Sequence, residues 1–291
     1  MFIKNYQYLK PTVDCGDHIE IEDINRKDYA VNQYMNKVHI EGITKPTALL
    51  YAAGFSLHQM ESRDITTVKD MFRGTVEPQR TSMLIRESTV YAMHRWIGSI
   101  ENKENIVYAS INSNTCASSM NSLYEAQRLL DDGICEEVII IAEERTSFNT
   151  LRIFKEHRVP ITCGDALAIV TLTKEPTQLE VVDTKWEYEY NNNPFLTTKS
   201  GYAKVNTKLD IDQIKPHGTG TAANNEAEID LIEGRDSVYY KKDTGHTQGA
   251  SALLELCMLI DDKAVVGDTL CVASGLGGFY GSCVLRKLDE A

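Results

Sequence analysis

Short apolar runs rich in β-branched residues alternate along this chain with longer amphipathic stretches, and this alternation constrains the fold more than any other feature. Runs of this kind are typical of strands buried on both faces, and the stretches between them are typical of helices that cover a sheet. The clearest predicted strands are residues 105–110, 137–142, 166–172, 179–183, 212–215, 269–273 and 281–286. The chain is therefore predicted to be an α/β protein.

Three helices are predicted where apolar residues recur every three or four positions. The first covers residues 81–100 and the second residues 117–132, where Gly133 supplies a stop signal. The third should cover residues 247–261. Residues 47–54 fit either a strand or the start of a helix, and the remainder of the first 80 residues has no clear pattern.

The length of the chain, 291 residues, is enough for one large core or two medium ones. Asn-Asn-Asn-Pro at 191–194 marks a loop, and a division between two halves is predicted near Glu175. The halves are then residues 1–175 and 176–291. Each half ends in strands after a long helix, which weakly indicates an internal duplication.

Charge and cysteine usage exclude several classes of function. The net charge of -12 repels phosphates, so neither a nucleic acid nor a membrane is predicted as a partner. Seven cysteines without a C-x-x-C pair predict reduced thiols in a cytoplasmic protein. No apolar run approaches the roughly 20 residues of a spanning helix. The histidines and cysteines lack the usual zinc-ligand spacings, so no metal site is predicted.

Cys116 follows a predicted strand and a tight turn and stands at the start of the helix at 117–132. The unpaired amides and the dipole at a helix N-terminus favour a thiolate, which is the reactive form of cysteine. A buried cysteine packed beneath the helix fits the same position, and free cysteines are most often core residues. The position alone therefore leaves both interpretations open.

Two glycine-rich segments each carry a histidine. Lys-Pro-His-Gly-Thr-Gly-Thr at 215–221 places His217 in a loop at a strand end, and Lys-Lys-Asp-Thr-Gly-His-Thr-Gln at 241–248 places His246 at the start of a helix. A single loop histidine is usually solvated. Two such histidines together with Cys116 favour a nucleophilic site.

A glycine turn, Ala-Ser-Gly-Leu-Gly-Gly-Phe-Tyr-Gly at 273–281, lies between the last two predicted strands. Its amides could act as oxyanion donors, because glycine gives backbone N–H groups the freedom to converge on one point. A simple β-hairpin turn explains the same residues equally well on local grounds.

The order of these motifs resembles the elongating β-ketoacyl synthases, also called ketosynthases, of fatty-acid and polyketide assembly. Residues 217–221 match their HGTGT motif at every position, and Lys241 with Gly245-His246 matches K-x-x-x-G-H. Residues 275–278 match GFGG, with Leu276 in place of phenylalanine. The HGTGT motif separates this family from thiolases and from the initiating synthases.

Weaker matches extend the resemblance from about residue 81 to the end of the chain. Residues 114–119 look like the nucleophile turn of the family, and residues 163–168 look like its G-[ED]-G-A-G strand opening. Glu228 falls where the family keeps an acid. Glu255 lies fourteen residues beyond Lys241, at the place of the carboxylate that pairs with that lysine.

The resemblance implies a thiolase-like, five-layer αβαβα fold made of two related halves with mixed sheets. Cys116 would take an acyl group from an acyl carrier protein, with the amides of Cys116 and Leu276 holding the oxyanion. Malonyl thioester would then lose carbon dioxide while His217 and His246 donate hydrogen bonds to the enolate. The remaining implied site residues are the Lys241–Glu255 pair, the malonyl-contacting Thr219 and Thr221, and the turn glycines Gly275 and Gly277. No metal or organic cofactor is implied.

The chain is shorter than the usual family member, so the tunnel for the acyl chain is predicted to be open or completed by another subunit. A homodimer, or a heterodimer with another ketosynthase-like subunit, is expected. Three functions stay open: a condensing enzyme, an acyltransferase or thioesterase-like enzyme that does not condense, and a partner subunit like a chain-length factor. A basic segment is predicted to dock the carrier protein, although a solvated face explains it as well. This segment contains Arg145, Arg152, Lys155, His157 and Arg158.

Overall fold

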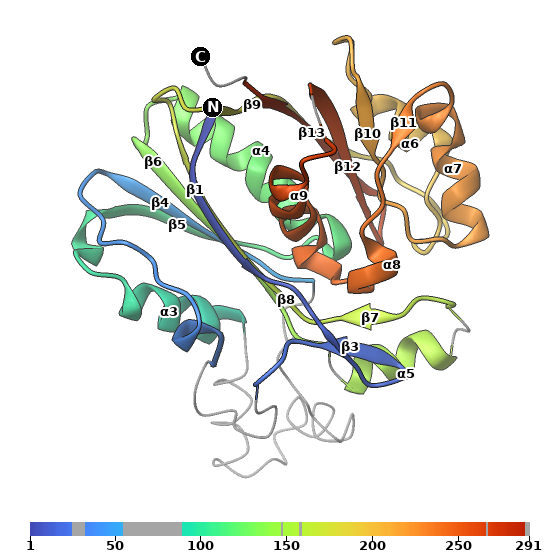
Figure 1. The fold of residues 1–291 in the computed structure, drawn as a ribbon, viewed down its shortest axis with the longest axis horizontal. Coiled ribbons are helices and arrows are strands. Elements are labelled where there is room, and N and C mark those ends of the chain that lie inside the picture. The colour runs from blue at the N-terminus through green and yellow to red at the C-terminus, as the bar shows by residue number, and fades with distance from the viewer. Residues whose placement is uncertain (25–32, 55–88, 147, 157–158, 266, 289–291) are drawn as a thin grey trace.

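The structure is a computed structural model, and it describes residues 1–24, 33–54, 89–146, 148–156, 159–265 and 267–288. Its main feature is a ten-stranded mixed sheet that runs through the molecule (Figure 1). The strands of one half of this sheet are β1 (Phe2–Leu9), β4 (Thr47–Ala52), β5 (Ile106–Asn112), β6 (Glu137–Glu144) and β8 (Ala166–Thr173). Those of the other half are β9 (Leu179–Tyr188), β10 (Gln213–Lys215), β11 (Asp236–Ser237), β12 (Asp268–Gly275) and β13 (Phe279–Lys287).

The two halves of the sheet repeat one topology. One half has the order β1-β8-β6-β4-β5 and the other has β9-β13-β12-β10-β11. In each half the first two pairings are antiparallel and the last two are parallel. A single residue pair, Phe2 with Glu180, joins β1 to β9. The position predicted for the domain division, near Glu175, lies between β8 and β9, and the division of the chain into two domains stays a prediction.

Helices form three layers that alternate with the two halves of the sheet. The inner layer contains α4 (Ser118–Asp131) and α9 (Ser251–Asp261), which contact strands of both halves. Outside the first half lies α3 (Thr89–Ser99). Outside the second half lie α6 (Lys199–Val205) and α7 (Ala222–Ile232) (Figure 1). The result is the predicted five-layer αβαβα arrangement.

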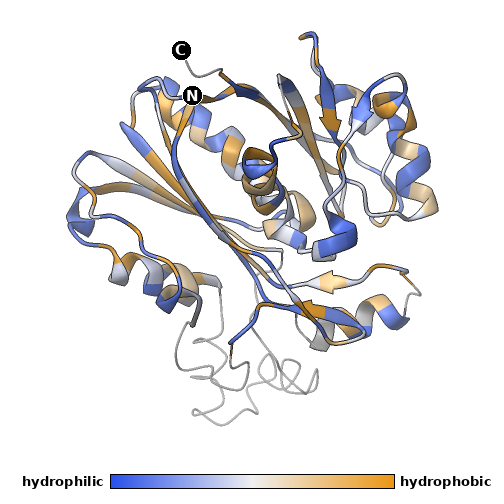
Figure 2. Ribbon diagram, in the orientation of Figure 1, coloured by the Kyte–Doolittle hydropathy of each residue, from blue (hydrophilic) through white to orange (hydrophobic). Residues whose placement is uncertain are grey.

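The strands are apolar on both faces because helices cover both faces. In β4, Ala48 and Leu50 belong to the inner core, whereas Leu49 and Tyr51 belong to the core beneath α3, as the two-residue period of a strand requires. Figure 2 shows the apolar residues running along the strands and along α9, which is buried almost completely. In the part of the chain that the structure describes, no helix is both long enough and apolar enough to span a bilayer.

All seven predicted strands are present, and residues 47–54 contain a strand rather than a helix. The helices predicted at 117–132 and 247–261 are present as α4 and α9. The helix predicted at 81–100 is present as α3, and residues 81–88 lie outside the described residues. The prediction assigned no element to the first strand, β1, yet this strand lies in the middle of the sheet.

Candidate active site

Cys116 lies in a single 3-10 turn (Thr115–Ala117) immediately before α4. Thr115 has a φ of 55°, a left-handed conformation that is unusual for a β-branched residue. The turn packs directly against the glycine turn that follows β12. A Cβ atom on Gly275 would lie 2.4 Å from the carbonyl oxygen of Asn114, so only glycine allows the two turns to approach this closely.

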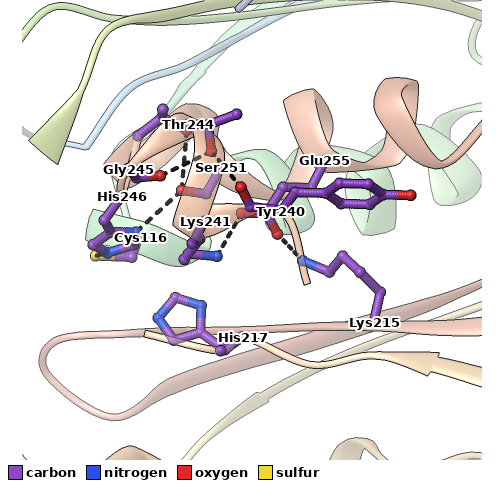
Figure 3. A network of polar contacts seen from close by, with 12 residues as sticks. Cys116, Lys215, His217, Tyr240, Lys241, Thr244, Gly245, His246, Ser251 and Glu255 are labelled. Carbon is purple, nitrogen blue, oxygen red and sulfur yellow. Dashed lines mark hydrogen bonds and ion pairs between the residues drawn. The ribbon is translucent and has the colours of Figure 1, made fainter. Parts of the chain in front are cut away.

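His246 is held beside Cys116 by its backbone and by a serine. Its N–H donates to the carbonyl oxygen of Thr162 at 2.7 Å, next to the short strand β7 (Cys163–Gly164). Its Nε2 lies 3.0 Å from the Sγ of Cys116, and its Nδ1 lies 3.2 Å from the Oγ of Ser251 (Figure 3). Thiol and imidazole are therefore at hydrogen-bond distance, as a nucleophile and its base require.

His217 comes from the loop after β10 and faces the same point from the opposite side (Figure 3). Its ring lies edge-on to that of His246, with 5.3 Å between centroids. The N–H of His217 donates to Oε1 of Glu228 at 2.5 Å, and the N–H of Gly218 donates to Oε2 of Glu228 at 3.1 Å, so α7 fixes the loop. The Nδ1 of His217 is buried and has no hydrogen-bond partner among the described residues.

A buried cluster of three charges lies beside the histidines. Lys241 donates to Oε1 of Glu255 at 2.6 Å, as the family resemblance implies. Lys215 donates to the other carboxylate oxygen of Glu255 (Figure 3). The side chains of Lys215, Lys241 and Glu255 are 1%, 9% and 2% exposed, so the cluster holds two cations and one anion almost out of water. Its net charge is positive.

Burial and this positive charge determine the protonation states. Burial raises the pKa of Cys116 to about 12, although Lys241 opposes the shift. Burial and then Lys241 lower the pKa of His246 to about 3, and the same two causes hold the pKa of His217 well below its usual value. Burial therefore acts on this thiol in the opposite direction to the helix N-terminus, and a Cys116 thiolate in the free protein stays a prediction. These shifts favour the neutral thiol and the neutral forms of both imidazoles.

A cavity of about 500 Å³ opens in front of the cysteine. The predicted site residues that line it are Cys116, His217, Thr219, Thr221, His246, Gly275, Leu276 and Gly277. The remaining wall is mainly apolar and includes Phe154, Val159, Ile161, Pro194 and Phe195. The hydroxyl oxygens of Thr219 and Thr221 lie 3.2 Å apart, and that of Thr221 also accepts from the N–H of Asn224, so it caps α7.

The basic segment lies partly on α5 (Phe148–Glu156), a helix that was not predicted. Arg152 and Lys155 are exposed on this helix, and Arg152 donates to Glu156 at 2.7 Å. Phe154 of the same helix lines the cavity. Arg145 is half-buried and does not line the cavity, and His157 and Arg158 lie outside the described residues.

Sequence reasoning missed two contributors to the site, Lys215 and Ser251. Lys215 is the last residue of β10, and His217 follows it in the loop. The sequence places Lys215 beside the histidine motif, but its contact with Glu255 joins residues 40 positions apart. Ser251 is five residues beyond His246, at the first position of α9, and nothing in the sequence marks it.

Comparisons with solved structures confirm the fold. The chain is similar to the ishigamide ketosynthase/chain length factor, with a TM-score of 0.70, 15% identity and coverage of 99% of both chains. It is also similar to AntDE:AntF, a type II polyketide synthase acyl-carrier protein in complex with its ketosynthase. This match has a TM-score of 0.73, 12% identity and coverage of 99% of both chains. A third match is a ketosynthase in complex with its chain length factor from Xenorhabdus doucetiae. It has a TM-score of 0.63 and 18% identity, and it covers 84% of this chain and 75% of that chain.

No family model matches the sequence, and no curated protein matches it. Identities of this size establish the fold alone. The chain has the thiolase-like fold of ketosynthases and chain length factors, as the sequence motifs predicted.

Proposed function

We propose that this chain is a β-ketoacyl synthase-like condensing enzyme, which takes an acyl group onto Cys116 and extends it by decarboxylative condensation with a malonyl-carrier protein. One observation carries the proposal. The Sγ of Cys116 lies 3.0 Å from Nε2 of His246, and the ring of His217 lies edge-on to that of His246. All three residues line one cavity. Formation of an acyl-cysteine requires the Cys116–His246 pair, and stabilisation of an enolate requires His217 as a second hydrogen-bond donor.

In the first step, the sulfur of Cys116 attacks the thioester carbon of the acyl-carrier protein. The thiol proton moves to Nε2 of His246 as the sulfur–carbon bond forms, because the raised pKa of the thiol keeps the proton on sulfur until then. Amides at Cys116 and Leu276 stabilise the oxyanion. When the intermediate collapses, the bond to the carrier sulfur breaks and His246 returns the proton to that leaving group.

In the second step, the bond between the malonyl α-carbon and its carboxylate breaks and carbon dioxide leaves. The electron pair moves onto the thioester oxygen, which accepts hydrogen bonds from the ring N–H groups of His217 and His246. The α-carbon then attacks the acyl carbon on Cys116. The sulfur leaves as a thiolate and recovers a proton from water.

Ser251 suits His246 to both steps. In the first step Nε2 must accept the thiol proton, so Nδ1 carries the hydrogen and donates it to Oγ of Ser251. In the second step Nε2 must donate, so Nδ1 accepts from the same hydroxyl. A hydroxyl group can both donate and accept, and the 3.2 Å contact therefore supports either tautomer.

The charged cluster supplies the field for this chemistry. Lys241 lowers the pKa of both imidazoles and opposes the rise of the pKa of the thiol. Glu255 keeps the two lysines in place, because a buried ammonium group without a partner is costly. We therefore assign Lys241 and Glu255 electrostatic roles.

We propose an acyl carrier protein as the first partner of this chain. The exposed Arg152 and Lys155 lie on the helix whose Phe154 lines the cavity, so a carrier bound to them would be close to its target. Thr219 and Thr221 are proposed to contact the malonyl group. A homodimer, or a heterodimer with another ketosynthase-like subunit, is proposed as the working assembly.

Intact-protein mass spectrometry tests the acyl-enzyme. Incubation with an acyl-carrier protein, alone and with a candidate partner subunit, should add one acyl mass to the wild type. The variant Cys116→Ala should show no adduct, whereas the control Cys257→Ala should retain it. Cys257 is buried in the inner core, away from the cavity. An unmodified wild type under all these conditions would exclude both enzymatic functions and favour a non-catalytic partner subunit.

A further inference from the structure

Away from the cavity, a cysteine, a histidine and a carboxylate converge at the tip of an N-terminal hairpin. The hairpin is formed by β2 (Val13–Asp14) and β3 (His18–Glu20). The Sγ of Cys15, a ring nitrogen of His18 and a carboxylate oxygen of Glu20 all lie within 4.8 Å of one another. We propose that these three side chains bind one divalent transition-metal ion, with zinc as the best match.

The backbone of the hairpin explains why the three ligands meet. The N–H of Cys15 donates to the carbonyl oxygen of His18 at 2.9 Å, which closes a tight turn and brings both residues to its base. His18 and Glu20 are two residues apart in β3, so they share one face of the strand. The sequence pattern is C-x-x-H-x-E, which common searches for paired cysteines or paired histidines do not detect.

A carboxylate group lies beside each ring nitrogen of His18. Its Nδ1 lies 2.6 Å from a carboxylate oxygen of Asp17, and its Nε2 lies 2.7 Å from Oε1 of Glu20. A carboxylate on one ring nitrogen fixes the tautomer and leaves the other nitrogen with its lone pair toward the ion. Metal–ligand bonds of ~2.0 to 2.3 Å place neighbouring ligand atoms roughly 3.3 to 3.8 Å apart. The ion would replace the proton shared by His18 and Glu20, with only a small outward shift.

The kind of ligand and the charge select the ion. A thiolate, an imidazole and a carboxylate suit zinc or cobalt, whereas magnesium and calcium prefer oxygen ligands alone. The two negative charges of the Cys15 thiolate and the Glu20 carboxylate would balance the two positive charges of the ion. Cys15 is the only exposed cysteine of the seven, so an ion can reach it from solvent.

The site would reinforce the support of the catalytic loop. Strand β3 pairs with β7: His18 lies opposite Cys163, and Ile19 lies opposite Gly164. Cys163 in turn pairs with His246 through an isolated bridge. Each of these pairings is only one or two residues long. A metal ion that cross-links the hairpin would therefore stabilise the backbone behind His246.

Cobalt(II) is the direct probe, because a thiolate ligand gives a sulfur-to-metal charge-transfer band. Titration of the purified full-length protein with cobalt should give this band at one equivalent, and zinc should abolish it by displacement. Cys15→Ser should lose the band, and Cys116→Ala should keep it. Asp17→Asn should weaken binding about 10-fold to 100-fold, as loss of an outer carboxylate does elsewhere.

Thermal unfolding gives a second readout that needs no enzymatic activity. Zinc should raise the Tm of the wild type and of Cys116→Ala, and should leave the Tm of Cys15→Ser and His18→Gln unchanged. A wild type that neither develops the band nor gains stability would overturn the proposal. A band that persists in folded Cys15→Ser, or that disappears only in Cys116→Ala, would assign the metal to the catalytic cysteine instead and overturn it equally.

Discussion

At the scale of single residues, burial affects the protonation of the proposed nucleophile, Cys116, more than any other cause. The thiol of Cys116 is desolvated, and this raises its pKa by more than Lys241 and the backbone hydrogen bond lower it. Its partner His246 is neutral for the same reason. We therefore expect a proton transfer that is coupled to bond formation, rather than a standing thiolate–imidazolium pair.

This environment predicts the pH dependence of alkylation at Cys116. Because the raised pKa of about 12 leaves the thiol protonated at neutral pH, the iodoacetamide rate should increase about tenfold per pH unit from pH 7 to pH 10. Peptide mass spectrometry at each pH gives the rate for the Cys116 peptide. A plateau already reached at pH 8 would mean that the free protein holds a thiolate.

The three-charge cluster predicts an asymmetry between two substitutions. Glu255→Gln removes the anion that both lysines share, so we expect the free energy of unfolding to fall by about 3 to 5 kcal/mol. Lys215→Met leaves the Lys241–Glu255 pair intact and should cost clearly less. Urea denaturation of the two variants measures the difference. Equal losses would show that the Lys241–Glu255 pair is not sufficient by itself once Lys215 is removed.

At the scale of elements, the contact of two turns positions Cys116, the proposed nucleophile. The turn at Thr115–Ala117 and the glycine turn after β12 touch at Gly275, and the hydroxyl of Thr115 donates to the carbonyl oxygen of Leu276 at 3.3 Å. Neither turn has room to move independently. The geometry of the proposed acylation should therefore depend on Gly275, which has no reactive side chain.

Gly275→Ala tests this contact. Its Cβ would meet the Asn114 carbonyl at 2.4 Å and the Thr115 hydroxyl at 2.6 Å, so the nucleophile turn must shift, and we expect the acylation rate to fall about 100-fold. Gly98→Ala is the control, because nothing lies within 4 Å of its added methyl group in α3. That variant should acylate normally and gain about 0.5 to 1 kcal/mol of stability. Normal acylation by Gly275→Ala would contradict the account.

Elements with a strong local pattern were predictable from the sequence, and those fixed by distant partners were not. Strand β6 is fully buried and reads as a continuous apolar run, so it was found. Strand β1, Phe-Ile-Lys-Asn-Tyr-Gln-Tyr-Leu, mixes polar and apolar residues, and only its pairing with β8 makes it central. The same holds in the site: motif spacing indicated Cys116 and His246, whereas the roles of Lys215 and Ser251 depend on tertiary contacts.

At the scale of the whole molecule, the two halves repeat one topology but share one inner layer. Helices α4 and α9 contact strands of both halves, and β1 pairs with β9 across the junction. The cavity also draws on both halves, because Cys116 comes from the first and His217 and His246 come from the second. Separation of the halves would therefore expose the core and divide the site.

Two tryptophans report on this coupling. Trp96 is buried beneath the first half, and Trp186 stacks on Phe279 in the second half. Variants with a single tryptophan, Trp96→Phe and Trp186→Phe, should show fluorescence transitions in urea that coincide with the loss of helical circular dichroism. Two midpoints that differ, one for each half, would show that residues 1–175 and 176–291 unfold as separate domains.

Release of carbon dioxide tests the central claim, that the second histidine makes this a condensing enzyme. Wild-type protein acylated on Cys116 should release carbon dioxide from malonyl-carrier protein and form the 3-oxoacyl product, alone or with its partner subunit. His217→Ala should still acquire the acyl group but should release carbon dioxide and form product at least 100-fold more slowly. An acylated wild type that releases no carbon dioxide, or a His217→Ala variant that condenses at the wild-type rate, would contradict it.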